Sequence, residues 1–167
     1  MYFQEQNENT DVYQIKDFTA SFNSFKRGRG VATFSKQMYQ IIDVKKENFQ
    51  ISKVSEEYFD LISIYRSQEE KDEILQELSK LINNERQTIV LGDFNLNFTK
   101  DCQHSMLKYL KVQKFSQLIQ NATHQQGGLI DLVFASHHFY KSEIIVHQIG
   151  VYYSDHDLIQ VKMSVNL

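Results

Sequence analysis

Apolar and polar residues alternate in short runs through the first part of the chain and predict strands. The runs are rich in Val, Ile, Phe and Tyr, which suit a pleated, half-buried surface. They cover residues 31–34, 39–44, 49–54 and 59–65. The period then becomes helical across residues 67–84, where Ser67 is placed to cap the helix and acidic residues occupy the first turn. One face of this predicted amphipathic helix carries Ile74, Leu75, Leu78, Leu81 and Ile82.

The second part of the chain mixes strands with short helical segments. Helical spacing runs through Met106, Leu107 and Leu110, and a shorter helical piece is expected around Phe115. Apolar runs predict further strands at residues 88–91, 129–134, 144–146 and 158–165. Many strands combined with few helices predict an α/β protein built in layers.

Length and composition predict a single domain spanning residues 1–167, because 41% apolar and 13% aromatic residues are enough for one core. The 21 acidic residues outnumber the 18 basic ones, so the chain has no global positive field to hold nucleic acid. The single cysteine, Cys102, excludes an intramolecular disulfide and fits a reducing compartment. No apolar run approaches the roughly 18 residues that span a bilayer. We therefore expect an intracellular protein, nuclear or cytoplasmic, without a membrane partner.

Two short polar motifs follow apolar runs and are the strongest chemical signals in the sequence. Gly92-Asp93-Phe94-Asn95 comes directly after an apolar strand, and Ser154-Asp155-His156 lies near the C-terminus. In an extended segment, Asp93 and Asn95 share one side while Phe94 turns into the core. Each motif alone also fits a turn or a helix cap, since Asp, Asn and Ser favour such positions.

Asp131 lies inside a predicted buried strand, where a carboxylate needs a partner. His156 is the expected partner, because a carboxylate fixes the tautomer of an imidazole and raises its pKa. Phosphodiester hydrolysis needs a cation, a base for the attacking water and donors for the phosphate oxygens. Carboxylate and carboxamide groups suit Mg²⁺ better than zinc.

The remaining histidines show no zinc-ligand spacing and are interpreted as surface or loop residues. They are His104, His124, His137, His138 and His147. The many tyrosines and phenylalanines lie mostly at strand-like positions, so we interpret them as core residues and not as stacking platforms for bases.

Taken together, the chain resembles the endonuclease/exonuclease/phosphatase superfamily, and within it the apurinic-endonuclease-like domain of non-LTR retrotransposons. The segments that carry the resemblance are residues 28–32, 64–67, 91–97, 122–124, 127–134 and 153–159. The resemblance implies a four-layered α/β/β/α sandwich with two mixed β-sheets, the DNase I-like fold. It also implies Mg²⁺-dependent nicking of DNA, with Mn²⁺ as an alternative cofactor.

Carried over by position, the resemblance implies roles for five side chains. Asp93 would orient or deprotonate the attacking water, and Asn95 would contact the scissile phosphate. Asp131 would pair with His156, and Tyr65 would reach a phosphate oxygen.

The resemblance implies a metal site at Asp155 and at the principal ligand of the family, a Glu for which Glu5 is the matching residue. The family begins with a further strand and helix, so we expect a domain that lacks its first strand-helix unit. After Tyr65 the family has Pro and Asn, whereas this chain has Arg66 and Ser67, followed by Gln68.

The alternatives to an active endonuclease are an impaired retroelement remnant that at most binds DNA or protein, and another phosphoesterase of the same fold. A reverse transcriptase is the expected downstream partner in the parent element. The sequence leaves the oligomeric state and the DNA target open.

Overall fold

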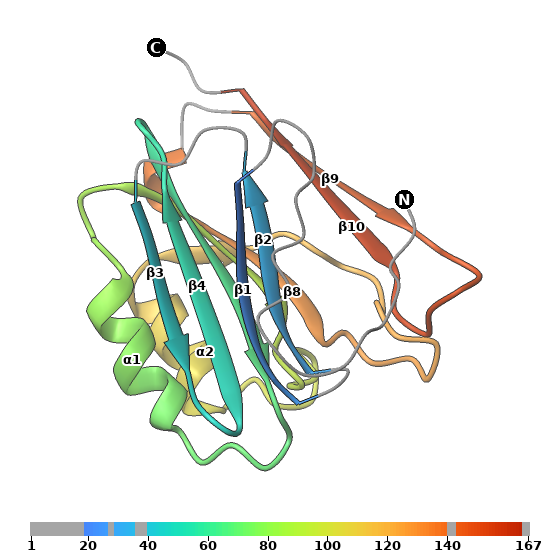
Figure 1. Ribbon diagram of the computed structural model, residues 1–167. Coiled ribbons are helices and arrows are strands. Elements are labelled where there is room, and N and C mark those ends of the chain that lie inside the picture. Colours follow the sequence, from blue (N-terminus) through green and yellow to red (C-terminus); the bar gives the residue numbers. More distant parts are fainter. Residues whose placement is uncertain (1–18, 27–28, 36–39, 140–142, 165–167) are drawn as a thin grey trace.

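The computed structural model describes residues 19–26, 29–35, 40–139 and 143–164, which form two helices, a 3₁₀ turn and three β-sheets (Figure 1). The helices are α1 (Glu73–Leu81) and α2 (Ser105–Val112), and the 3₁₀ turn η1 is His137–Phe139. The strands are β1 (Thr19–Lys26), β2 (Arg29–Ser35), β3 (Gln40–Lys45), β4 (Phe49–Ser55), β5 (Phe59–Arg66), β6 (Gln87–Asp93), β7 (Phe115–Gln117), β8 (Asp131–Ser136), β9 (Ile144–Ile149) and β10 (Leu158–Met163).

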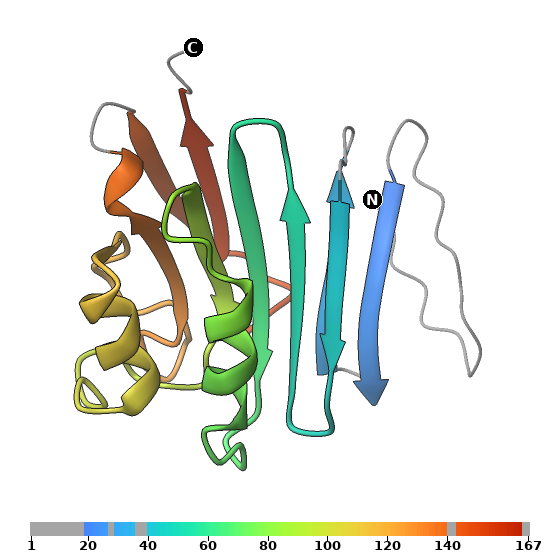
Figure 2. The ribbon, with the colours of Figure 1, turned by 90° about the vertical axis from the view of Figure 1, so that its left-hand side faces the viewer.

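The central element is a six-stranded mixed sheet with strand order β3-β4-β5-β6-β8-β7. Strands β5 and β6 run parallel, with α1 as their crossover, and the other pairs are antiparallel. The hairpins β1–β2 and β9–β10 form two-stranded sheets. Helices α1 and α2 cover one face of the six-stranded sheet, and the hairpins lie on the other side (Figures 1 and 2).

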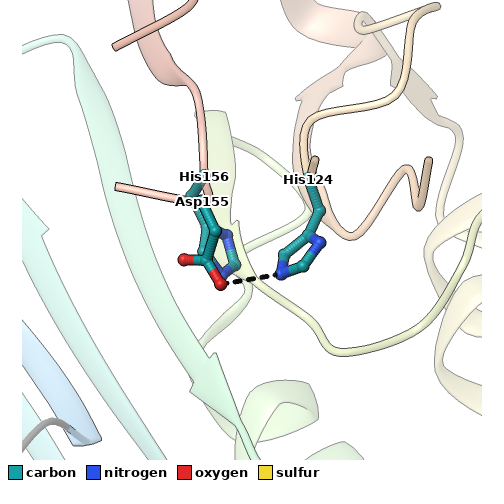
Figure 3. A group of neighbouring side chains, drawn as sticks. All are labelled: His124, Asp155 and His156. Carbon is teal, nitrogen blue, oxygen red and sulfur yellow. Dashed lines mark ion pairs between the residues drawn. The ribbon is translucent and has the colours of Figure 1, made fainter. Parts of the chain in front are cut away.

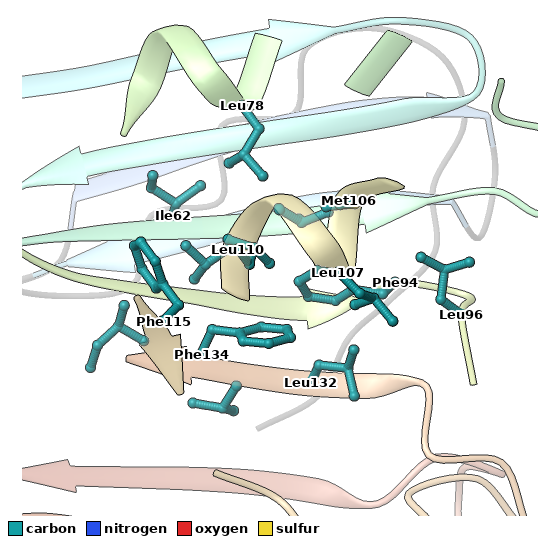
Figure 4. Close-up of a cluster of buried hydrophobic side chains, with 14 of the residues drawn as sticks. Ile62, Leu78, Phe94, Leu96, Met106, Leu107, Leu110, Phe115, Leu132 and Phe134 are labelled. Atoms are coloured by element: carbon teal, nitrogen blue, oxygen red, sulfur yellow. The ribbon is translucent and has the colours of Figure 1, made fainter. Parts of the chain in front are cut away.

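The core lies mainly between the six-stranded sheet and the helices (Figure 4). Alternation along β5 explains why, because Ile62 and Ile64 are buried on the helix side while Leu61, Ser63 and Tyr65 occupy the opposite face. Each fully buried side chain of this size contributes about 1.5–3 kcal/mol of transfer free energy. The residues that Figure 4 labels are Ile62, Leu78, Phe94, Leu96, Met106, Leu107, Leu110, Phe115, Leu132 and Phe134.

The first helix is shorter than the pattern predicts, because it begins at Glu73 and not at Ser67. Arg66 explains the difference: its Nε donates to Glu70 Oε2 at 3.0 Å, and the other carboxylate oxygen of Glu70 accepts the backbone N–H of Ile74 at 2.9 Å. Ser67 donates its backbone N–H to the carbonyl of Asn48. Residues 67–72 are thus used as a connection, and Glu70 supplies the acceptor that Ser67 was expected to provide.

The helical piece expected around Phe115 is wrong, since Phe115–Gln117 forms the edge strand β7 against β8. Lys114 adopts a positive φ of 61°, which ends the preceding helical segment. Phe115 is buried, and the backbone N–H of Leu118 donates to the carbonyl of Val133. Pairing with β8 therefore overrides the local helical spacing.

Neither helix in the described part of the chain has the length and apolar character needed to cross a bilayer.

Candidate active site

Three of the predicted site residues stand in one row at one end of the six-stranded sheet. Tyr65 of β5 is in register with Asp93 of β6, and Asp93 is in register with Asp131 of β8. Residues opposite each other in a ladder point to the same face. All three therefore lie on the face away from the helices, where loops after the strands converge.

Gly92 allows β6 to pass close to β5. Its φ is +136°, and a Cβ built on it would lie 1.9 Å from the carbonyl oxygen of Ile64. No side chain fits at that distance, so the glycine of the motif is a steric requirement. Phe94 anchors the other side of the motif: it is fully buried, as predicted, and its N–H donates to the carbonyl of Ile130.

Asp93 and Asn95 meet through a turn and not through the extended geometry that the sequence predicts. The strand ends at Asp93, and Asn95 adopts a left-handed φ of 46°. Its backbone N–H donates to Asp93 Oδ1 at 2.9 Å, and its Nδ2 donates to Asp93 Oδ2 at 3.2 Å and to the carbonyl of Arg66 at 2.7 Å. Both carboxylate oxygens of Asp93 are therefore oriented by one neighbour.

Asn95 uses its two amide hydrogens in these contacts, so its carbonyl oxygen is the atom best suited to meet a cation or a water. The role that the sequence assigns to it at the phosphate stays a prediction.

Asp131 and His156 form a direct pair. The Nδ1–H of His156 donates to both carboxylate oxygens of Asp131, at 3.1 and 2.9 Å. In the neutral ring this tautomer leaves Nε2, on the other edge, without a proton. Thr123 Oγ1 accepts the backbone N–H of Asp131 at 3.0 Å and helps to hold the start of β8.

The electrostatics of the site move two pKa values in the same direction. Burial raises the pKa of Asp93 above its ordinary value of 3.8; Asp131 adds to this, while the N–H of Asn95 and the two nearby histidines oppose it. Burial lowers the pKa of His156, but the hydrogen bond and charge of Asp131, with the charges of Asp93 and Asp155, outweigh it and raise the pKa above 6.5. The site thus combines a more basic carboxylate with a more readily protonated imidazole.

Asp155 and His124 form a second contact, beside the pair of Asp131 and His156; Figure 3 shows His124, Asp155 and His156. Asp155 has a side chain that is 63% exposed, and its Oδ2 lies 3.3 Å from His124 Nε2. The rings of His124 and His156 meet edge to face at 4.7 Å. His124 lies in a loop, as interpreted, but only 15% of its side chain is exposed, so it is not a surface residue and it lies beside the candidate site.

The tautomer of His124 follows from its other contact. The backbone N–H of Gln126 donates to His124 Nδ1 at 3.1 Å, so in the neutral ring the proton sits on Nε2 and faces Asp155. In this tautomer the Nε2–H of His124 donates to the Asp155 carboxylate. Residues 122–124 carry part of the family resemblance, but the sequence assigned His124 no role, because an antiparallel bridge between His124 and His156 brings together two loops far apart along the chain.

The two loops that carry these histidines are tied together by backbone bonds. The N–H of Gln125 donates to the carbonyl of Asp155 at 2.9 Å, and the N–H of Asp157 donates to the carbonyl of Thr123 at 2.8 Å. Gln125 Nε2 also donates to the carbonyl of Ser154 at 3.2 Å. The site is thus built from strand ends and from a cross-braced pair of loops.

Two groups of side chains place possible ligand atoms within 4.8 Å of one another. One is Asp93, Asp131 and His156, and the other is His124, Asp155 and His156. A cleft of about 210 Å³ runs from Asp93 and Asp131 between β6, β8 and β10. The oxygen atoms of Asp93, Asn95, Asp131 and Asp155 are of the type that Mg²⁺ and Mn²⁺ prefer, so the donor set fits such an ion. Glu5, the other expected ligand, lies outside the described residues.

Comparisons with solved structures identify the fold. The chain is similar to the endonuclease domain of TRAS1, a telomere-specific non-LTR retrotransposon, with a TM-score of 0.64 and 13% identity over 89% of this chain and 79% of that one. It is also similar to CdtB, the biologically active subunit of cytolethal distending toxin (TM-score 0.58, 12% identity, 78% of this chain and 59% of that one). An endonuclease/exonuclease/phosphatase family protein from Leptotrichia buccalis C-1013-b gives a TM-score of 0.58 at 15% identity, over 93% of this chain and 74% of that one.

These similarities confirm the predicted DNase I-like fold class. None of the curated proteins matches the chain. Residues 59–160 match the family described as endonuclease-reverse transcriptase, a segment that includes Tyr65, the Asp93 motif, Asp131 and His156. The chain therefore belongs to the endonuclease-reverse transcriptase family, within the endonuclease/exonuclease/phosphatase fold.

Proposed function

We propose that this protein is a divalent-metal-dependent phosphodiesterase that nicks DNA, of retroelement origin. The observation that carries the proposal is the cluster of Asp93, Asp131 and His156, whose carboxylate and imidazole groups have atoms within 4.8 Å of one another. Membership of the endonuclease-reverse transcriptase family and similarity to the TRAS1 endonuclease domain support DNA as the substrate. A reverse transcriptase is the partner that the family description favours.

Asp93 is the proposed base for the attacking water. Its carboxylate is held by Asn95, and burial raises its pKa, which makes it a stronger proton acceptor. The water oxygen forms a bond to phosphorus while the bond to one bridging oxygen breaks. The water proton passes to Asp93, and the leaving oxygen takes a proton from solvent.

His156 is the proposed donor to a non-bridging phosphate oxygen. Asp131 keeps the proton on Nδ1 and raises the pKa of the ring, so the protonated form also offers an Nε2–H. Tyr65 stands beside Asp93 in register and is the proposed second phosphate contact.

The ligands proposed for Mg²⁺, or for Mn²⁺ in its place, are Asp155 and Glu5, with the Asn95 carbonyl oxygen as a further candidate. When bound, the ion supplies charge neutralisation at the phosphate. The remaining chemistry belongs to the side chains described above.

The test is nicking of supercoiled plasmid by the purified protein in Mg²⁺, in Mn²⁺ and in EDTA. The proposal expects relaxed circles with either metal and none with EDTA. A folded protein that leaves the plasmid supercoiled under all three conditions contradicts it and favours an impaired remnant. Hydrolysis of a phosphoinositide or a nucleotide by the same protein, without nicking, favours another phosphoesterase of this fold.

A further inference from the structure

Two adjacent tyrosines stand in solvent on the loop that leads to the candidate site. Tyr152 is 98% exposed and Tyr153 is 72% exposed. Their rings meet edge to face, with centroids 5.3 Å apart and an interplanar angle of 83°. The interpretation of the tyrosines as core residues is therefore wrong for this pair. Large aromatic side chains are normally buried in part, so two neighbouring tyrosines this exposed are a candidate contact surface.

Hydrogen bonds hold the part of the loop that directly follows this pair. Residues 150–157 connect β9 to β10, and in Figure 1 this connection projects away from the sheets. Gln125 braces its far end through bonds to the carbonyls of Ser154 and Asp155. Ser154 Oγ accepts the backbone N–H of His156 at 3.0 Å. The two rings are thus presented from a loop that is braced by the same contacts as the site.

The pair also lies close to the candidate chemistry along the chain. Tyr153 is separated from Asp155 by Ser154 alone, so the Cα atoms of Tyr153 and Asp155 are at most about 7.6 Å apart. A nucleotide whose phosphate is held near Asp155 and His156 would therefore lie near the loop that carries the rings.

We propose that Tyr152 and Tyr153 form a stacking platform for a nucleobase next to the phosphate held at the candidate site. This inference rests on the proposed function. The formal net charge of −3 means that counterion release across the surface contributes little, so binding must draw on local contacts. Stacking on aromatic rings supplies such contacts and tolerates any base, because every base has a π face. The platform needs an unstacked base, so it favours single-stranded or locally distorted DNA.

A second copy of the chain is the competing occupant. Ile149 and Leu158 pair across β9 and β10 at the base of the loop and are 44% and 50% exposed. An aromatic and aliphatic surface of this kind also suits self-association. Removal of a tyrosine ring should weaken oligonucleotide binding if a nucleobase occupies the surface, and should weaken dimerisation if a second copy does. One set of variants therefore distinguishes the two occupants.

The experiment measures binding of a single-stranded oligothymidine that carries one 2-aminopurine, in EDTA so that no cleavage occurs. Stacking of the fluorescent base on a tyrosine quenches it, and the quenching gives the dissociation constant. The proteins are wild type, Tyr152→Ala, Tyr153→Ala and the matched Phe variants, which keep the ring and lose only the hydroxyl. Tyr58→Ala is the control, because Tyr58 is a half-exposed tyrosine in the β4–β5 turn, at the other end of β5 from Tyr65.

The proposal expects each Ala variant to weaken binding about fivefold to a hundredfold, with the loss of quenching. The Phe variants and Tyr58→Ala should remain within about twofold of wild type. Unchanged affinity in both Ala variants overturns the platform, and so does a wild type that does not bind the oligonucleotide. Ala variants that convert a dimer into a monomer in sedimentation, with oligonucleotide affinity unchanged, also overturn it and assign the surface to a second copy.

The outcome for the platform is separable from the outcome for nicking. Tyrosine-dependent binding by a protein that never nicks plasmid leaves the platform standing and contradicts the proposed function. If the Ala variants nick plasmid at wild-type rates in the presence of metal and bind the oligonucleotide as wild type does, the proposed function stands and the platform is overturned.

Discussion

The Nδ1–H of His156 donates to both oxygens of the Asp131 carboxylate, at 3.1 and 2.9 Å, and so joins the β9–β10 loop to the start of β8. This contact fixes which edge of the imidazole is left for substrate. Burial alone would lower the pKa of His156. The hydrogen bond and the charge of Asp131 are the largest of the effects that raise it. The Asp131–His156 pair therefore both holds the loop against β8 and orients the imidazole for its proposed role.

Replacing Asp131 by Asn tests that dependence. Asp131→Asn removes the negative charge and one of the two acceptor oxygens, so His156 loses its preference for the protonated form. We expect nicking to fall on the order of 10²- to 10⁴-fold and the His156 titration, followed by NMR, to move to lower pH. Glu85→Gln, on an exposed turn, is the matched control and should change neither. An unchanged His156 titration in Asp131→Asn would contradict the pairing.

The rate of nicking should show a bell-shaped dependence on pH. The proposed active form has Asp93 deprotonated and His156 protonated. The rate rises as pH increases through the Asp93 pKa, which burial places above 3.8, and falls as pH increases through the His156 pKa, which its acidic neighbours place above 6.5. Single-turnover rates across this range provide the measurement. A rate that keeps rising after His156 has lost its proton would exclude a cationic His156 from the mechanism.

Both shifts make the stability of the fold decrease as pH rises, each in its own pH range. The raised pKa of His156 contributes stability that is present below 6.5 and is lost as pH rises through the folded value. The raised pKa of Asp93 means that its ionised form destabilises the fold above that pKa, and this penalty disappears as pH falls below 3.8. Asp93→Asn should therefore have a denaturation midpoint at neutral pH that is no lower than wild type, measured in urea. A clear loss of stability would show that the contacts with Asn95 outweigh burial of the charge.

Gly92 and Gly127 offer a matched pair of glycine substitutions. Gly92→Ala places a methyl group against the Ile64 carbonyl in a backbone conformation with φ of +136°, so we expect a loss of about 2–4 kcal/mol in the free energy of unfolding. Gly127 has φ of +81° and no neighbour within 4 Å of the point that a Cβ would occupy, so Gly127→Ala should lose about 1 kcal/mol. Urea denaturation measures both. Equal losses would contradict the steric account of the Gly92 motif.

The buried ion pair of Arg66 and Glu70 should contribute far more to the free energy of unfolding than the exposed ion pair of Glu77 and Lys80 in α1. Their side chains are 5% and 1% exposed, and Arg66 also donates to the carbonyls of Glu70 and Phe94. Glu70→Ala leaves a buried guanidinium without its partner and should lose about 3–5 kcal/mol. Glu77→Ala, which breaks an exposed pair with Lys80, should lose at most about 1 kcal/mol. Similar losses would show that Arg66 finds other partners.

The sequence predicts much of this fold because local pattern and tertiary packing agree over most of it. The spacing of β5, β6 and β10 yields strands close to their observed bounds, and Phe94 is buried as the motif requires. The start of α1 and the strand β7 were mispredicted, because contacts of Arg66 with Glu70 and pairing of Phe115 with β8 decide them. Such contacts depend on tertiary packing, which a local sequence pattern does not contain.

The candidate site, too, was predicted only in part from the sequence. Asp93, Asn95, Asp155 and His156 are visible in the sequence as polar residues of two short motifs, and Asp131 as a carboxylate inside an apolar run; the structure brings all five to one end of the sheet. His124 was given no role because its position in the site depends on the bridge to His156, which forms only in the folded protein. The exposure of Tyr152 was missed because an aromatic residue next to a strand has the same local pattern whether its side chain is buried or exposed.

The most direct test of the account compares plasmid nicking by wild type and Asp93→Asn in Mg²⁺, with circular dichroism to show that both are folded. If Asp93 accepts the proton of the attacking water, the isosteric change should lower the nicking rate about 10²-fold or more while the spectrum stays the same. A folded Asp93→Asn protein that nicks plasmid at the wild-type rate would contradict the assignment of this cluster as the active site.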